Sequence, residues 1–420
     1  MSSRPAPFGL FGAAAGSAIF QLIREAGPLA RADIGRITGL SKSTVSQHVE
    51  RLLRLGLVTE EPDARYPAGR KRKQLVFNES AGYVVAIDLG ATSVDIALCD
   101  LGASVLEHRE LLDVAVSDGP QRVLGRIVEQ VDDLLAKHAI TPDQLYGMGM
   151  GVPGPVEFST GHPIHPPIMP GWHKYPIKEF LTERYGCLVY IDNDVNVMAV
   201  GEAKYGAGVG VENQLFVKIG SGIGCGVILG GRLYRGTHGC AGDIGHISLR
   251  GNEELCSCGN RGCLEAIASG RALGRLGTRL AMDGESFELA QVLTQKGTVS
   301  AEDIAYLARR GDPLSLSLLR MSGQAIGEVL AGIINFINPS LIVVGGGVSK
   351  SGQRLIATIK EVILSKSTPL ATSTLEVVPS KLGGMAGVIG AAALVVDEVF
   401  SQERVFAMVN QEGMPSAGGD

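Results

Sequence analysis

Three cysteines and one histidine near the middle of the chain are the ligand types of a metal site. Cys256, Cys258 and Cys263 lie within eight residues, and His246 lies ten positions before Cys256. Thiolate sulfur and imidazole nitrogen are the ligands that tetrahedral Zn²⁺ prefers, and the intervening glycines allow the turns that would gather them. Because four such ligands leave no open position, the pattern predicts a structural zinc and not a catalytic one. A flexible loop of reduced cysteines is the alternative.

Glycine clusters that could approach a phosphate follow three apolar segments. Asp88-Leu89-Gly90-Ala91-Thr92 follows the predicted strand Tyr83–Ile87, which would place a carboxylate, an open backbone and a hydroxyl beside a phosphate and its Mg²⁺. Alone this motif is weak, because Gly and Asp occur in many turns. Similar clusters follow the predicted strands Leu215–Ile219 and Leu341–Val344. The candidate phosphate-loop residues are Asp88, Gly90, Thr92, Gly220, Gly222, Gly224, Gly345 and Gly346.

The segment Gly242–Glu265 resembles the signature of the ROK family of sugar kinases and sugar-responsive repressors. Gly-Asp-Ile-Gly-His is followed there by Cys-x-Cys-Gly-x-x-Gly-Cys-x-Glu, and matching segments run from about Tyr83 to Phe400. The resemblance implies an actin-like (RNase H-like, sugar-kinase superfamily) body of two related α/β domains that close on a nucleotide and a sugar. Periodicity by itself supports only an alternating α/β body.

The resemblance also implies a sugar-binding set. In the family the metal-bound histidine contacts a sugar hydroxyl, as do acidic residues at the positions of Asp243 and Glu265; the kinases usually have Glu at the first of these. The segment Ile191–Asn196 matches an Asn-Asp-x-Asn element whose carboxylate, here Asp194, is the general base of phosphoryl transfer. Taken alone, Asn-Asp is also typical of a turn or a helix cap. The expected sugar-binding residues are Gly154, Asn193, Asp194, Asp243, His246 and Glu265.

Two positions of the first phosphate loop favour a repressor over a kinase. Family kinases typically read Asp-x-Gly-Gly-Thr-Lys there, and this chain has Ala91 and Ser93 in place of the second Gly and the Lys. A methyl group obstructs the approach of a phosphate to the backbone, and a cation is lost. We therefore do not expect ATP or Mg²⁺ to bind, and Asp194 is catalytic only if kinase activity is retained. An ATP-dependent, glucokinase-like hexose kinase with a DNA-binding head stays open as the alternative.

The first eighty residues have the pattern of a winged helix-turn-helix. We predict helices from about Ala13 to Gly27, over Arg31–Thr38, and from the N-cap Ser41 onward. In the third helix Val45, Val49, Leu52 and Leu53 form an apolar stripe, with His48 on its flank. The segments 57–59 and 74–77 read as two strands, and the layout resembles the DNA-binding head of ROK repressors. A small helical packing domain is the alternative.

Polar and basic residues of this head are the candidate DNA contacts. The outward face of the third helix would meet base edges, and the basic run between the two strands would contact phosphates or reach a minor groove. The residues concerned are Lys42, Ser43, Thr44, Ser46, Gln47, Arg51, Arg70, Lys71, Arg72 and Lys73.

Charge and composition agree with a DNA-binding head joined to a body that binds no nucleic acid. Residues 1–80 hold 12 Lys and Arg against 7 Asp and Glu, and the remaining residues hold 26 against 36. A basic head on an acidic body suggests that only the head meets nucleic acid. The cysteines outside the metal motif show no paired pattern, and we find no signal-peptide pattern and no apolar run long enough for a membrane span. We therefore expect a cytoplasmic protein.

These observations define the predicted organisation and function. We expect a disordered segment over 1–12, the winged head over 13–78, a first body domain over 82–195 completed by a helix at about 383–400, a second body domain with the zinc site over 196–382, and a flexible tail over 405–420. The predicted function is a sugar-responsive transcriptional regulator, in particular a repressor. Its partners would be double-stranded operator DNA and a sugar or sugar phosphate, and it would assemble as a homodimer or homotetramer.

Overall fold

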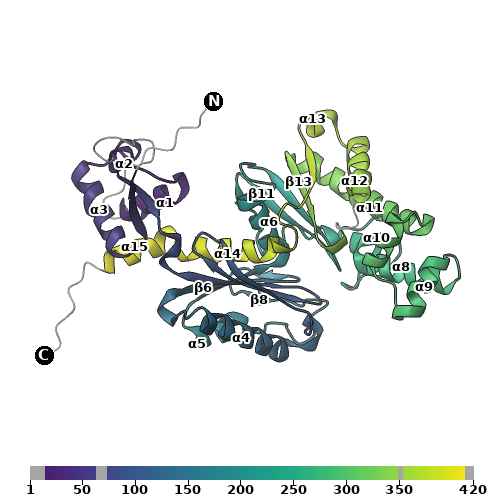
Figure 1. Ribbon diagram of the computed structural model, residues 1–420. Coiled ribbons are helices and arrows are strands. Elements are labelled where there is room, and N and C mark those ends of the chain that lie inside the picture. Colours follow the sequence, from purple (N-terminus) through teal and green to yellow (C-terminus); the bar gives the residue numbers. More distant parts are fainter. Residues whose placement is uncertain (1–14, 63–72, 349–352, 412–420) are drawn as a thin grey trace.

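The computed structural model describes residues 15–62, 73–348 and 353–411. A small head lies at one end of the molecule and is joined through two helices to a body of two α/β lobes (Figure 1). The predicted architecture, an N-terminal winged helix followed by a two-domain α/β body, is therefore confirmed.

The head follows the order of elements that its sequence predicts. Ser41 caps the third helix, because its side-chain oxygen accepts a hydrogen bond from the Thr44 backbone N–H at 3.1 Å. The two strands pair antiparallel, with Val58 opposite Phe77. The elements are α1 (Ala15–Ala26), α2 (Arg31–Thr38), α3 (Lys42–Arg54), β1 (Val58–Pro62) and β2 (Lys73–Phe77).

The apolar stripe of α3 forms much of the head core. Val45, Val49 and Leu52 are buried, as predicted, whereas Leu53 is only half-buried. His48, which we placed on the flank, is 8% exposed and packs against Gly16 of α1. It is buried because α1 crosses α3 at that point. Burial, with a smaller contribution from Arg51, lowers the pKa of His48.

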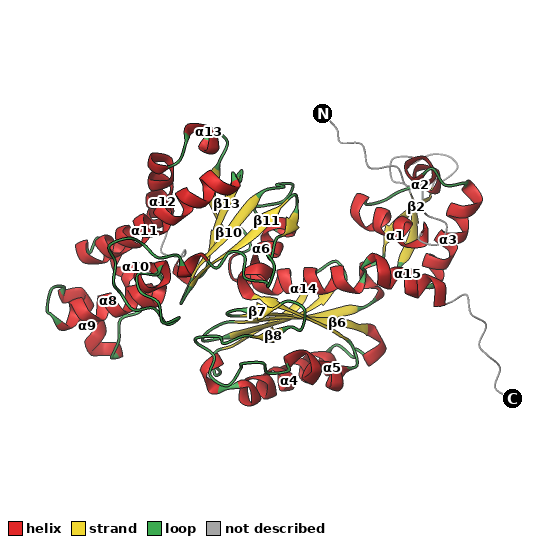
Figure 2. Ribbon diagram, turned by 180° about the vertical axis from the view of Figure 1, so that it is seen from behind, coloured by secondary structure: helices red, strands yellow, loops and turns green. Residues whose placement is uncertain are grey.

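Lobe I is built on a five-stranded sheet in the order β5-β4-β3-β6-β9. β3, β6 and β9 are parallel, and β4 and β5 continue antiparallel from β3. α4 and α5 cover one face of this sheet (Figure 2). The elements are β3 (Tyr83–Leu89), β4 (Val94–Asp100), β5 (Val105–Leu111), α4 (Pro120–Lys137), β6 (Leu145–Val152), the short hairpin β7 (Val156–Glu157) and β8 (His162–Pro163), α5 (Ile177–Tyr185) and β9 (Leu188–Asn193).

Lobe II repeats this topology with the sheet order β12-β11-β10-β13-β14. β11 is antiparallel to both β10 and β12, and β13 and β14 run parallel to β10, as β6 and β9 run parallel to β3 in lobe I. The two lobes are therefore related domains, as the resemblance implies. The elements are β10 (Gln214–Ile219), β11 (Ile223–Leu229), β12 (Arg232–Leu233), α7 (Leu264–Ala268), α8 (Gly270–Met282), α9 (Phe287–Lys296), α10 (Ala301–Arg309), α11 (Pro313–Ile337), β13 (Leu341–Gly345), α12 (Gln353–Lys366), α13 (Pro369–Thr372) and β14 (Glu376–Pro379).

Two helices lie between the lobes, α6 (Asp194–Tyr205) and α14 (Ala386–Val399). α14 lies along the face of the lobe I sheet opposite α4 and α5, as both overall views show (Figure 2). The helices touch backbone to backbone, since a Cβ on Gly390 would lie 1.7 Å from the Val197 carbonyl oxygen. No single helix in the described ranges is long and apolar enough to cross a membrane; only the bent pair 383–399 and 402–410 passes that test of length and composition.

The C-terminal segment joins the head to the body. Our prediction of a frayed tail after Val405 is wrong as far as Gln411, because α15 (Gln402–Gln411) packs against α1 with Val405 and Val409 buried. The sequence hid this helix because the segment is short and the partners of its apolar residues lie in the distant head. The remaining residues of the predicted tail, 412–420, lie outside the described ranges, as do 1–14.

Aromatic and ionic contacts hold the head on this segment. The rings of Phe20 and Phe77 in the head lie 5.2 Å and 5.5 Å from the ring of Phe400, and Tyr146 of lobe I lies 5.9 Å from it. At the edge of this cluster Arg24 of α1 forms an ion pair with Asp397 of α14 at 2.7 Å. The head is thus packed onto the end of α14 by a hydrophobic core and is not tethered by a free linker.

Candidate functional site

A cleft of about 1200 Å³ lies between the two lobes. Its walls come from the β3–β4 turn and the loop after β6 in lobe I, and from the glycine-rich turn after β10 and helix α8 in lobe II. The loop between β12 and α7, which carries the cysteines, closes one end. The cleft therefore brings together polar residues that are distant in the sequence.

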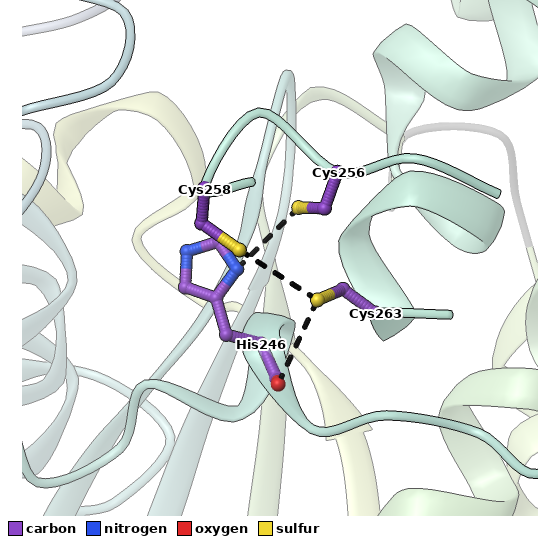
Figure 3. Close-up of side chains that lie close together, drawn as sticks. All are labelled: His246, Cys256, Cys258 and Cys263. Atoms are coloured by element: carbon purple, nitrogen blue, oxygen red, sulfur yellow. Dashed lines mark hydrogen bonds between the residues drawn. The ribbon is translucent and has the colours of Figure 1, made fainter. Parts of the chain in front are cut away.

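The four predicted metal ligands converge beside this cleft (Figure 3). The ligand atoms of His246, Cys256, Cys258 and Cys263 all lie within 4.8 Å of one another. His246 Nδ1 lies 3.6 Å from the Cys256 sulfur, and the Cys258 and Cys263 sulfurs lie 3.8 Å apart. Three thiols and an imidazole at these distances could hold one metal ion.

The other ring nitrogen of His246 faces away from the sulfurs. Its Nε2 lies 3.9 Å from Asp243, which comes just before it in the chain and also lines the cleft. Glu265, two residues after Cys263, accepts a hydrogen bond from the Ile223 backbone N–H at 3.1 Å and one from the Ser257 hydroxyl at 3.4 Å. Ser257 belongs to the cysteine loop. The loop therefore supports, from one side, three of the residues that we expect to bind a sugar.

Asn193 and Gly154 form the opposite wall. The Asn193 side-chain oxygen accepts from the backbone N–H groups of Val195 and Asn196 and so caps α6. Its amide nitrogen donates to the Gly154 carbonyl at 2.9 Å. The helix-cap alternative is therefore correct for this residue. The amide keeps one further N–H, and Asn193 lines the cleft, so a ligand contact remains geometrically open.

Asp194, the predicted general base, forms an ion pair with Lys218, a residue that sequence analysis missed. One of its carboxylate oxygens accepts from the Val195 N–H, and the other lies 2.5 Å from the Lys218 ammonium. The Lys218 side chain is 20% exposed and the Asp194 side chain is 6% exposed. Lys218 was detectable as a single charged residue inside the apolar run of β10.

Asp88 lies beneath the cleft, at the end of β3. It is 6% exposed, and its Oδ1 has no hydrogen-bond partner among the described residues. Gly387 packs so closely on it that a Cβ there would lie 1.8 Å from Asp88 Oδ2. Burial raises the pKa of Asp88 to about 7, and Lys218 opposes this rise.

The predicted phosphate-loop residues divide into two groups. Thr92, Gly220, Gly222 and Gly224 line the cleft. The remaining four lie at or near the ends of strands or in the turns that follow them, and they are not among the residues that line the cleft. These residues are Asp88, Gly90, Gly345 and Gly346.

Arg235, which the sequence did not single out, ties the two lobes together beside the cleft. It follows β12 of lobe II, and its guanidinium lies 2.8 Å from the Asp192 carboxylate and 2.8 Å from the Tyr190 hydroxyl, both on β9 of lobe I. It also stacks on Phe158, 4.4 Å from the ring centroid. The same loop carries Asp243, so this contact helps to position a candidate ligand residue.

The outward face of α3 is open for a second kind of ligand. Of the predicted DNA contacts, Lys42, Ser43 and Gln47 are exposed, while Thr44, Ser46 and Arg51 are half-buried. Lys73 begins β2 and forms an ion pair with Glu60 at 2.6 Å. The other three residues of the basic run lie outside the described ranges. They are Arg70, Lys71 and Arg72.

Similar proteins fall into two groups that differ in how much of this chain they match. The xylose repressor of Bacillus subtilis (strain 168) is 32% identical over 371 residues, which cover 88% of this chain and 91% of that protein. A glucokinase of Halalkalibacterium halodurans is 33% identical over 323 residues, which cover 77% of this chain and 97% of the glucokinase.

Solved structures show the same division. A ROK family transcriptional regulator, described as a homolog of the E. coli MLC protein, aligns over 95% of this chain and 99% of its own with a TM-score of 0.81 and 26% identity. The ROK family glucokinase of Streptomyces griseus, in complex with glucose and AMPPNP, aligns over 74% of this chain and 99% of its own with a TM-score of 0.66 and 29% identity.

Family models account for both parts of the molecule. Residues 13–65 match the MarR family model, which covers the helices of the head and the start of its wing. Residues 84–398 match the ROK family model, from the first strand of lobe I to the end of α14. Because that match spans well over half of the sequence, the chain belongs to the ROK family.

Proposed function

We propose that this protein is a sugar-responsive DNA-binding repressor. The observation that supports the proposal is the combination of a winged helix packed on the body with a cleft that gathers the side chains predicted to bind a sugar. The relatives named as a repressor and a regulator match 88% and 95% of the chain, which is more than the body alone contains, whereas the glucokinases match 77% and 74%, which is about the share that the body makes up. The hexose-kinase alternative therefore accounts for less of the molecule.

The head supplies the DNA-binding surface. The exposed face of α3 would enter a major groove, with Lys42, Ser43 and Gln47 toward the bases or the adjoining phosphates. The basic run Arg70–Lys73 would add contacts to phosphates that carry little sequence information. Two copies of the chain would place two heads on two half-sites of an operator.

The cleft supplies the effector site. Asn193, Asp243 and Glu265 offer hydrogen-bond donors and acceptors around His246 Nε2, which suits the hydroxyl groups of a sugar or sugar phosphate. Relatives are named for xylose and for glucose, so these two sugars are the first candidates.

The metal held by the cysteine loop would be zinc with a structural role. Two sulfurs on a tetrahedral zinc are about 3.8 Å apart, and a sulfur and an imidazole nitrogen are about 3.6 Å apart. The Cys258–Cys263 separation is 3.8 Å and the Cys256–His246 Nδ1 separation is 3.6 Å. Zinc would fix the orientation of the His246 ring through Nδ1 and leave Nε2 for the sugar. All four positions are taken by protein ligands, so this metal would not activate a water molecule.

Signals would pass from the cleft to the head through α6 and α14. α6 begins at Asn193 and Asp194 in the cleft, and α14 begins beside Asp88 and ends in the aromatic cluster around Phe400. Asp397 of α14 forms ion pairs with Lys204 of α6 and with Arg24 of the head. A change in the angle between the lobes would therefore move both helices and, with them, the head. A coupling free energy of about 1–3 kcal/mol between sugar and operator would suffice for regulation.

Selection from random duplexes followed by titration tests the proposal. The full-length protein would first enrich a duplex from a random library, and its affinity for that duplex would then be measured by fluorescence anisotropy with and without xylose or glucose. We expect a sugar to weaken DNA binding by about 5- to 150-fold. Failure to enrich any sequence, with affinity independent of salt, would refute the DNA-binding role.

A further inference from the structure

Three charged groups from three different elements meet at the floor of the cleft. Asp88 is the penultimate residue of β3 in lobe I, Asp194 begins α6, and Lys218 lies on β10 in lobe II. Asp194 and Lys218 line the cleft, and Asp88 lies just beneath it. This is the floor on which the glycine-rich turn after β10 would present a phosphate, because that turn begins two residues after Lys218.

The ammonium group of Lys218 is paired with the Asp194 carboxylate. Lys218 Nζ lies 2.5 Å from Asp194 Oδ2, and the Lys218 charge also acts on Asp88, whose pKa it lowers against the effect of burial. Asp88 Oδ1 has no hydrogen-bond partner among the described residues. The cluster therefore contains two carboxylates and one built-in cation, in a place almost closed to solvent.

A nucleotide needs a different arrangement at this place. Mg²⁺ is bound by one or two carboxylates together with phosphate oxygens and water, in an octahedron with ligands at about 2.1 Å. An ammonium group already in contact with Asp194 occupies that carboxylate and repels a divalent ion. We infer that Lys218 is an internal cation that takes the place of the divalent ion accompanying a nucleotide, so that the cleft admits a sugar but not a metal–nucleotide complex.

The far end of the cleft fits the same inference. Ala91 and Ser93 line it at the first loop, and Glu302 adds a carboxylate beside Gly347. Arg275 lines the cleft too, but its guanidinium is engaged with Glu254 at 2.8 Å and with the Ala266 carbonyl at 3.0 Å. A triphosphate would thus meet the Glu302 carboxylate and, in Arg275, an arginine that is already paired; Arg271 also lines the cleft. This inference concerns the cleft alone and goes beyond the proposed function: it holds or fails whether or not the head binds DNA.

Manganese is a suitable probe, because it resembles Mg²⁺ in its oxygen ligands and its free form is visible by electron paramagnetic resonance. The full-length protein, saturated with zinc beforehand, would be titrated with MnCl₂ alone and then with MnCl₂ and ATP. We would compare the unchanged protein with Lys218→Thr, Lys218→Gln and Lys218→Arg. Lys218→Gln serves as a second neutral variant in case Lys218→Thr does not fold, since it keeps an N–H donor toward Asp194.

We expect the neutral variants to bind Mn²⁺ more tightly than the unchanged protein by on the order of tenfold or more, because a like charge is removed from the site. Lys218→Arg keeps the charge and should bind Mn²⁺ as weakly as the unchanged protein. Adding Asp194→Asn to a neutral variant should abolish the gain. Equal Mn²⁺ affinity in all four proteins, or tight binding of Mn²⁺ and ATP by the unchanged protein, would overturn the inference and leave Lys218 as a structural ion pair only.

Discussion

The two ends of the interlobe cleft differ in how well their side chains are arranged for binding. At the end near the cysteine loop, Glu265 is held by Ile223 and Ser257, and Asn193 is held by Gly154 and the start of α6. At the other end, the first loop carries Ala91, and the nearest acid to Gly347 is Glu302. One end is therefore built to hold polar ligand atoms in fixed positions, whereas the other presents a methyl group and a carboxylate at the two loops where a phosphate would approach.

The difference between the two ends indicates that a regulator needs only the ligand-binding part of a fold that can also carry out phosphoryl transfer. Transfer requires a nucleotide, a divalent ion and an attacking hydroxyl in line, and most of the catalysis comes from that positioning. Regulation requires only that a ligand favour one arrangement of the lobes over another by a few hydrogen bonds. We call the end near the cysteine loop the sugar end and the end near Ala91 and Glu302 the nucleotide end. For regulation we expect the sugar end to be sufficient.

The largest effect should come from Cys258→Ser at the sugar end. Loss of one thiolate should release the zinc and free the His246 ring, so we expect the affinity for the effector sugar to fall by about 100-fold or more. DNA binding without sugar should stay within about 3-fold of the unchanged protein, because the head has its own core. Zinc content by mass spectrometry and sugar binding by calorimetry measure the two effects.

The matched control is Cys240→Ser, which changes an exposed cysteine of the same cleft that is not among the four ligands. It should leave zinc content and sugar affinity unchanged. If Cys258→Ser abolished DNA binding as completely as sugar binding, the metal would support the whole fold, and the separation of the two ends would not hold.

A smaller loss should follow Glu265→Gln. The carboxylate accepts from Ile223 and Ser257 and lines the cleft. A hydrogen bond to a charged group contributes about 1.5–3 kcal/mol, and glutamine keeps one acceptor oxygen, so we expect the lower value and a fall in sugar affinity of roughly 10-fold. Glu302→Gln makes the same chemical change at the nucleotide end and should have no effect on sugar affinity. Equal losses in both variants would show that the two ends act as one site. Calorimetry with the effector sugar distinguishes these outcomes.

Much of this comparison could be predicted from the sequence, because its signals are local. The spacing of Cys256, Cys258 and Cys263 indicated one metal loop, and Ser41 marked the start of α3 as an N-cap. Ala91 and Ser93 indicated the altered phosphate loop because a short motif has fixed positions. The roles expected for the sugar-binding residues remain predictions, although the structure places all six of them around one cleft.

What the sequence could not supply depends on contacts between distant elements. Lys218 reads as one charge in an apolar strand, and only folding brings it to Asp194, twenty-four positions earlier. Arg235 and Asp192 meet in the same way across the two lobes. α15 was missed because its burial depends on α1, at the other end of the chain. Such partners carry no periodic or spacing signal.

Asp88→Asn should change stability with pH beneath the nucleotide end. The pKa of Asp88 is about 7 in the folded protein, above the value near 3.9 of an unfolded aspartate, so the folded state binds more protons between these pH values. The contribution of Asp88 to the free energy of unfolding therefore falls as pH rises from about 4 to 7. Above about pH 7 the buried carboxyl is ionised, and its destabilising effect on the folded state no longer increases. Asparagine does not ionise, so the stability of the variant relative to the unchanged protein should rise by roughly 2–3 kcal/mol between pH 5 and pH 8.

Thermal unfolding at several pH values measures this gain. Asp143→Asn, which alters an exposed aspartate of the same lobe, should leave the pH profile as it is. An Asp88→Asn variant whose advantage is equal at pH 5 and pH 8 would mean that Asp88 is not buried with a raised pKa. Sugar affinity at pH 7 should change little, because Asp88 does not line the cleft.

The smallest effect should come from rebuilding the first phosphate loop. Ala91→Gly with Ser93→Lys removes the methyl group and restores a cation, the two features that resemble those of family kinases. We still expect no transfer of phosphate from ATP to glucose or xylose, because Lys218 continues to hold Asp194 and to repel the divalent ion. A coupled assay for ADP formation, with Mg²⁺ and each sugar, provides the measurement. Turnover in this double variant, lost again on Asp194→Asn, would show that the loop alone had silenced the site and that the two ends of the cleft remain equally capable of chemistry.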